Sequence, residues 1–165
     1  MADQLQLQSL VTKEGTLEVS LAKVPVPVPA EDEVVVRVEA SPINPSDLGM
    51  LFGMADISTA SYSGTGESAI VTASIPENIR KIVAARAGQP MPVGNEGGGV
   101  VVEAGSSEEA QSLLGKTVGI LGGAMYTQFR AIKAKQCLVM HEGVTSAESA
   151  SCFVNPLTAL GMVET

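Results

Sequence analysis

The residues best suited to chemistry in this chain are amides and carboxylates. Asn44 stands between two prolines in the segment from Ala40 to Asp47, and Asp47 follows it by three residues. A fixed amide N–H can stabilise negative charge on an oxygen in a dry site. Asn44 is therefore a candidate donor. Asp47 either orients this amide or caps the short helix that Pro45 is expected to open.

A second segment, Met91 to Gly105, places five glycines around Glu96 and beside three consecutive valines. Glycine costs about 0.5–1 kcal/mol of conformational entropy in an ordered element, so a cluster indicates that backbones or a ligand approach closely. A glycine-rich turn that leads into a core strand explains the pattern equally well. A third segment, Asn155 to Gly161, follows near the end of the sequence.

In this order and spacing the three segments resemble the catalytic domain of the medium-chain dehydrogenase/reductase superfamily, in its zinc-free quinone-oxidoreductase-like branch. The resemblance covers residues 14–165. It implies a mainly β fold with short helices (α+β), a GroES-like, partly open antiparallel β-barrel over residues 1–155 with an insert at 53–90. Residues 156–165 would begin a helix that leads to a Rossmann domain, which is absent from this chain, so that the chain is truncated.

The resemblance also implies a reductase site without zinc. Where zinc-dependent members carry Cys, His and Cys, this chain has Asn44, Asn95 and Asn155, and neutral amides are poor zinc ligands. No metal ligand is therefore expected. The site residues implied by the resemblance are Asn44, Asp47 and Tyr126 for catalysis, and Asn155, Leu157 and Thr158 for contact with the cofactor.

Each of these positions also has a simpler interpretation. Tyr126 fits a half-buried strand tyrosine, Asn155 fits a helix cap, and Asp47 fits a cap for the helix at Pro45. Cys152 lies three residues before the third ligand position, which keeps a misaligned metal ligand open.

NADPH is the expected cofactor, although the chain lacks the unit that would bind its adenine half. The glycines from Gly94 to Gly99 precede a strand, whereas the dinucleotide fingerprint follows a strand and opens a helix. We therefore expect a quinone or conjugated-carbonyl reductase portion that is inactive alone, with a small-molecule carbonyl or quinone substrate and homo-oligomeric assembly. The alternative is a stand-alone GroES-like binding or scaffold domain without catalysis.

Composition narrows the classes of partner. The net charge of −8 argues against nucleic acid and anionic membranes, which select basic surfaces. The two cysteines lack the spacing of a disulfide framework or zinc ribbon. Neither a signal peptide nor an apolar run of about 18 residues is visible, so the expected compartment is cytoplasmic.

Alternating and helical patterns of apolar residues predict the strands and helices. Ser58 to Gly66 is rich in small polar residues and is expected to be a loop, forming a mobile flap over the cleft mouth. Leu160, Met162 and Val163 are expected to present one apolar face of the last helix. Strands are expected around residues 5–7, 17–21, 33–39, 100–102, 117–121, 125–131 and 136–140, and helices from Pro45, over 75–83, 107–114 and 145–153, and from Pro156.

Overall fold

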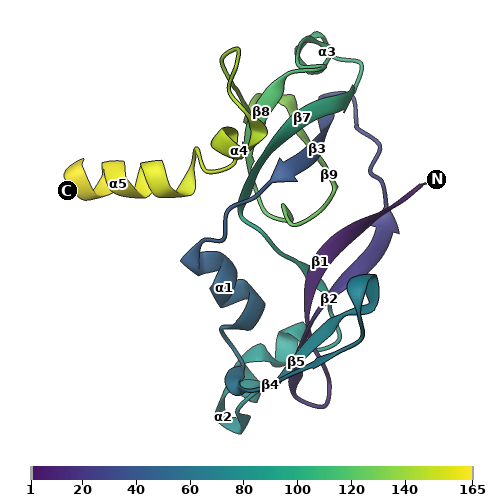
Figure 1. Ribbon diagram of the computed structural model, residues 1–165, viewed down its shortest axis with the longest axis vertical. Helices are drawn as coiled ribbons and strands as arrows, with labels where there is room; N and C mark the ends of the chain where they lie inside the picture. Colours follow the sequence, from purple (N-terminus) through teal and green to yellow (C-terminus); the bar gives the residue numbers. More distant parts are fainter. Residues whose placement is uncertain (1, 165) are drawn as a thin grey trace.

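The computed structural model describes residues 2–164, which form two five-stranded antiparallel sheets (Figure 1). The first sheet has the order β4-β5-β2-β1-β6, with β1 (Asp3–Val11), β2 (Thr16–Pro25), β4 (Asp56–Ser63), β5 (Ile70–Ser74) and β6 (Met91–Pro92). The second has the order β10-β8-β7-β3-β9, with β3 (Glu33–Ala40), β7 (Glu96–Ala104), β8 (Thr117–Leu121), β9 (Phe129–Lys133) and β10 (Cys137–Val139).

Short helices connect and cover the strands. They are α1 (Pro45–Phe52), α2 (Glu77–Val83), α3 (Glu108–Ser112), α4 (Ser146–Ser149) and α5 (Val154–Glu164), with single 3₁₀ turns at Gly66–Ser68, Ala84–Arg86 and Ala134–Gln136. Within residues 2–164, the helices are all too short or too polar to cross a membrane. The mainly β architecture with short helices is the one expected from the sequence.

Each sheet encloses its own apolar core. In the second sheet, Val34 and Val36 of β3 pack with Val118 and Ile120 of β8 in a fully buried cluster, and the sheet curls around it as part of a barrel (Figure 1). The first sheet buries Leu17, Ile75 and Val93 together with Leu51 from α1. Because α1 packs into the core of the first sheet and directly follows β3, it fixes the position of one sheet relative to the other.

Packing accounts for the glycine run of β7. A Cβ atom on Gly98 would collide with Ser149 and Ser146 of α4, and one on Gly99 would collide with the backbone of Arg37 in β3. Gly97 approaches Ser41 in the same way, since its Cβ would lie 2.8 Å from the serine Oγ. These glycines allow α4, β3 and the loop after β3 to lie directly on β7. The core-strand interpretation of this segment therefore holds for these three glycines.

The expected loop at Ser58 to Gly66 is wrong over most of its length, because residues up to Ser63 belong to the edge strand β4. All eight residues of β4 are exposed, so the strand shows none of the alternation that marks a half-buried strand. Only Asp56 and the Ser61–Ser63 segment pair with β5. β4 lies at the opposite end of α1 from α4 and α5 in Figure 1, and its mobility as a flap stays a prediction.

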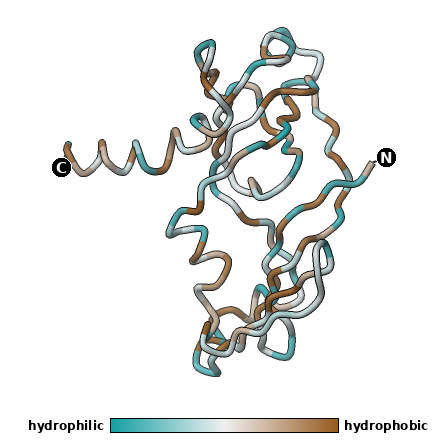
Figure 2. The backbone as a smooth tube through the Cα atoms, viewed as in Figure 1, coloured by the Kyte–Doolittle hydropathy of each residue, from teal (hydrophilic) through white to brown (hydrophobic). Residues whose placement is uncertain are grey.

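The last helix, α5, projects away from both sheets (Figure 1), and each residue from Asn155 to Glu164 is exposed. Figure 2 shows hydrophobic stretches along this projecting helix. The expected single apolar face is wrong, since Met162 lies about 200° around the helix from Leu160. Apolar side chains on several sides are typical of a helix that is enclosed by other structure.

Candidate active site

Asn44 lies where β3 has ended and α1 begins. It is the N-cap of α1, with extended backbone angles, and only 2% of its surface is exposed. Its backbone N–H donates to Asp47 Oδ2 at 2.8 Å, which is the carboxylate half of a capping box. Pro45 occupies the first helical position, where its missing N–H costs nothing. The local sequence therefore fixes the backbone of Asn44 before any tertiary contact is made.

Asp47 is completely buried and uses both carboxylate oxygens as acceptors. Besides the N–H of Asn44, it accepts the N–H of Asn95 at 2.9 Å, in the turn that leads into β7. Asp47 thus caps α1 and also joins it to the glycine-rich segment. Its Oδ2 binds the backbone N–H of Asn44, so Asp47 positions that residue.

Glu96, which the sequence analysis did not select as a site residue, is the centre of this polar cluster. It is 0% exposed, and its Oε1 accepts the Asn44 Nδ2–H at 3.0 Å. Its Oε2 accepts the backbone N–H groups of Phe153 and Val154, both at 3.0 Å. The signal that could have identified it is a single carboxylate at the start of a run of glycine and valine, where an acidic residue is stable only with dedicated donors.

Tyr126 lies in the loop between β8 and β9, directly against Gly94. A Cβ on Gly94 would lie 2.7 Å from the Tyr126 nitrogen, and the φ of Gly94 is +99°, so glycine is required there on both grounds. The Tyr126 hydroxyl donates to the carbonyl of Pro42 at 3.0 Å. Burial raises the pKa of the Tyr126 hydroxyl to about 12, and the negative charge of Asp47 adds to the shift. Tyr126 is thus a protonated donor at neutral pH.

The raised pKa of Tyr126 predicts a titration that can be measured directly. In the Tyr62→Phe variant Tyr126 is the single tyrosine, and its phenolate absorbance should appear with a midpoint near pH 12 in the folded protein and near 10 in urea. The folded state holds this proton more tightly than the unfolded state does. The protonated Tyr126 hydroxyl therefore contributes to folding stability below about pH 10, and this contribution is lost between about pH 10 and 12. A folded-state midpoint at the urea value would contradict the buried position of Tyr126.

The cofactor residues expected on α5 do not join the cluster in this chain. Asn155, Leu157 and Thr158 are exposed, and α5 starts at Val154, so Asn155 lies inside the helix and the expected cap at Asn155 is wrong. Glu96 binds the N–H groups at this helix end instead. The Thr158 hydroxyl donates to the Val154 carbonyl at 2.6 Å, a bond within the helix. The fold therefore brings Asn44, Asp47 and Tyr126 together and leaves the α5 residues beside them on an open helix.

Comparison with known proteins supports the fold. No protein-family model matches the chain, and no curated protein matches it. Solved structures, however, do match the chain. A candidate NADPH:quinone reductase from Mesorhizobium loti aligns with a TM-score of 0.63 and 22% identity over 99% of this chain and 44% of its own. The chain has the GroES-like fold.

Two further solved structures share this GroES-like fold. The quinone oxidoreductase of Coxiella burnetii aligns with a TM-score of 0.62 and 16% identity over 99% of this chain and 46% of its own. A mycobacterial protein complexed with NADPH aligns with a TM-score of 0.62 and 19% identity, over 98% and 41%. The GroES-like chain thus spans less than half the length of the structures it matches. The fold expected from the three sequence segments is confirmed.

Asn44, Asn95 and Cys152, which the sequence analysis weighed as metal-ligand positions, all donate hydrogen bonds to other groups. The Asn44 amide nitrogen faces Glu96, and the Asn95 Nδ2 donates to Ser46 Oγ at 2.7 Å. Cys152 is half-buried and its thiol donates to the Glu148 carbonyl at 3.6 Å. Among residues 2–164 there is no group of three or more His, Cys, Asp or Glu side chains that could hold a metal ion.

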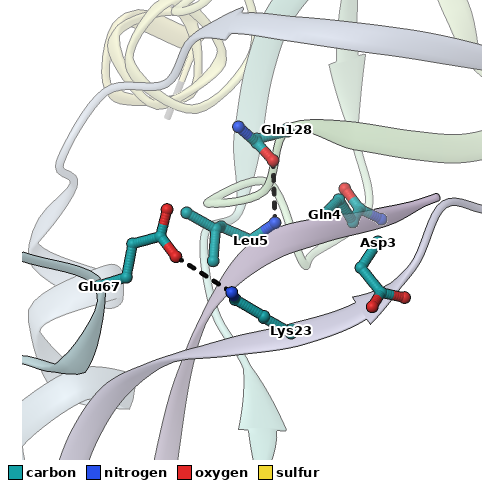
Figure 3. Close-up of a pocket in the computed structure, with 6 residues that line it drawn as sticks. All are labelled: Asp3, Gln4, Leu5, Lys23, Glu67 and Gln128. Carbon is teal, nitrogen blue, oxygen red and sulfur yellow. Dashed lines mark hydrogen bonds and ion pairs between the residues drawn. The ribbon is translucent and has the colours of Figure 1, made fainter.

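A polar cavity lies at the N-terminal end of β1, and none of the six expected site residues lines it. It has a volume of about 250 Å³ and is lined by residues from β1 and β2, Glu67 and Gln128 (Figure 3). Lys23 and Glu67 form an ion pair of 3.3 Å across it, with both side chains well exposed. This pair ties residues 66–68 of the expected insert to β2 and contributes little to stability, because solvent screens exposed pairs.

Proposed function

We propose that this chain is the substrate-side portion of an NADPH-dependent, zinc-free oxidoreductase that reduces quinones or other conjugated carbonyls. The observation that carries the proposal is the buried cluster of Asn44, Asp47 and Glu96, which Glu96 joins to the start of α5 and beside which the half-buried Tyr126 lies. Support comes from neighbours of the same fold, one described as a quinone oxidoreductase and another complexed with NADPH.

Asn44 supplies a hydrogen-bond donor to this site, whereas Tyr126 donates its one hydroxyl hydrogen to the Pro42 carbonyl and so supports the adjacent loop. Glu96 takes one hydrogen of the Asn44 amide, and the second is the one that a substrate carbonyl oxygen would accept. Tyr126 keeps its proton because its pKa is about 12. NADPH would supply the hydride when bound, and the Asn44 amide would hold the substrate oxygen on which negative charge develops. The Asn44 donor acts in a buried setting, where such bonds are stronger than in water.

The residues of this chain that are suited to contact the cofactor lie at the start of α5. Asn155, Leu157 and Thr158 are exposed on the first turns of α5, next to the Glu96 cluster, and would contact the nicotinamide end. The glycines of β7 are occupied by α4 and β3, so they provide no cradle for phosphates. We therefore propose that the remaining nucleotide contacts belong to a further domain and that this chain alone does not reduce substrate.

The proposal is tested by joining a nucleotide-binding domain to residue 165 and measuring NADPH oxidation with 1,4-naphthoquinone. Asn44→Ala in the joined protein should lower kcat about 100-fold, because it removes a donor to the developing oxyanion, with the NADPH dissociation constant unchanged. Asn95→Ala is the matched control, since that amide bonds Ser46 at the surface and should leave kcat within about twofold. Equal kcat in all three proteins, or turnover by residues 1–165 alone, would refute the proposal.

Association through α5 is a further expected property of the isolated chain. Leu157, Leu160, Met162 and Val163 are 52–85% exposed, and burying each is worth about 1.5–3 kcal/mol. Sedimentation velocity of residues 1–165 should show dimers or larger species. Replacing Leu160 and Val163 by glutamate should give a monomer, whereas Ile82→Glu, at an equally exposed site on α2, should not. A monomeric unmodified chain would contradict this expectation.

A further inference from the structure

A single buried side chain, Glu96, joins three elements that are distant in the sequence. It begins β7, its Oε1 binds the amide of Asn44 at the start of α1, and its Oε2 binds the first N–H groups of α5. Every residue of α5 from Asn155 onward is exposed. The two bonds to Oε2 and the short connection from α4 therefore link the start of α5 to the second sheet.

The chemistry of a carboxylate determines which way the Asn44 amide faces. Both oxygens of Glu96 act as acceptors, so the amide must direct its nitrogen toward Oε1. The opposite orientation would place two acceptors against each other inside the protein, with the cost of an unpaired buried group. A glutamine at position 96 would carry only one acceptor, and it could not satisfy Asn44 in this orientation and α5 together.

We propose that Glu96 is a positioning residue that fixes the direction of the Asn44 amide and couples it to the N-terminal end of α5. A displacement of α5 moves the donors on Oε2, and the same carboxylate transmits that movement to Asn44. The consequence for substrate reduction rests on the proposed function, because the amide nitrogen is then the group held toward a substrate oxygen. The coupling itself belongs to the unliganded chain and can be measured without substrate.

The coupling is tested by NMR spectroscopy of residues 1–165, with the Asn44 side-chain amide and the backbone N–H groups of Phe153 and Val154 as reporters. Glu96→Ala should accelerate hydrogen exchange of Phe153 and Val154 about tenfold or more and should shift the Asn44 side-chain resonances. Glu96→Gln should preserve one of these two sets of bonds and lose the other. Glu103→Gln, the same change on the exposed end of β7, should alter neither. Unchanged reporters in Glu96→Gln would overturn the proposal, even if Glu96→Ala fails to fold.

Transmission from α5 to Asn44 is tested by a pair of substitutions at Val154. Val154→Pro removes one N–H donor to Oε2 at a helix position that tolerates proline, and the Asn44 side-chain resonances should shift although proline does not touch them. Val154→Ala keeps the N–H and should leave Asn44 unchanged. Identical Asn44 spectra in the two variants would overturn the coupling. Addition of 1,4-naphthoquinone tests the proposed function separately. A missing response of the Asn44 resonances would refute substrate binding at this site. The comparison of unliganded variants would still decide the role of Glu96.

Discussion

Replacing Asp47 by alanine should lower the free energy of unfolding by about 4 kcal/mol. The carboxylate is 0% exposed and accepts the backbone N–H groups of Asn44 and Asn95. Alanine leaves both donors unpaired inside the protein, and each such donor costs about 1–3 kcal/mol. Because small domains have a total stability of only about 5–15 kcal/mol, this one change removes a large fraction of it.

Urea unfolding followed by circular dichroism measures the effect of Asp47→Ala. Asp47→Asn keeps the shape and one acceptor oxygen, so it should lose about half as much. Asp3→Ala removes an acidic side chain from an exposed position in β1 and should change stability by less than about 0.5 kcal/mol. If Asp47→Ala behaved like Asp3→Ala, the cross-link between α1 and β7 would contribute no stability and the cap would be formed by other groups.

Replacing Gly98 by alanine should destabilise the fold by about 3 kcal/mol, through steric overlap alone. The added methyl group would overlap Ser149 and the Ser146 carbonyl and would lie 2.8 Å from the Ala150 nitrogen. Two of these three contacts are backbone atoms of α4 and the residue after it, so a side-chain rotation cannot relieve them. α4 would have to move off β7, and the first residues of α5 would move with it.

Gly49→Ala is the matched control for Gly98→Ala. Gly49 lies inside α1 with no atom within 4 Å of the position where its Cβ would be built. The same methyl group should there stabilise the protein by about 0.5–1 kcal/mol, since alanine loses less entropy than glycine in a helix. Opposite signs of the two stability changes, measured by thermal or urea unfolding, would show that packing against α4 explains the glycine in β7. A loss below about 1 kcal/mol for Gly98→Ala would contradict that explanation.

Local patterns in the sequence were sufficient for the elements that carry their own signals. β3 follows from its alternating valines, α1 from Asn44, Pro45 and Asp47, and α4 from the Thr145 cap, whose hydroxyl accepts the Glu148 N–H as the spacing predicts. These signals depend on contacts within about four residues, which the chain makes wherever it is placed. The GroES-like fold was expected from the resemblance of three segments, in order, to a known superfamily.

Elements without a local signal were placed incorrectly. β4 is an edge strand exposed on both faces, so its residues have no reason to alternate, and its serines and threonines are indistinguishable from those of a loop. The sequence analysis assigned the start of α5 to an Asn155 cap. The actual acceptor is the side chain of Glu96, which lies 57 residues before Phe153 in the sequence. No pattern near residue 155 could reveal that partner.

The sequence by itself determined the helix start at Asn44, Pro45 and Asp47, and the resemblance of its three segments implied the class of fold and the candidate residues Asn44, Asp47 and Tyr126. Only the tertiary structure decided how they are arranged. Burial of Glu96 between α1 and α5 directs the Asn44 amide, and the close approach of Gly94 brings Tyr126 next to Asp47. The physical reason is that hydrogen bonds to a buried carboxylate join residues far apart in the chain, and their geometry exists only in the folded protein.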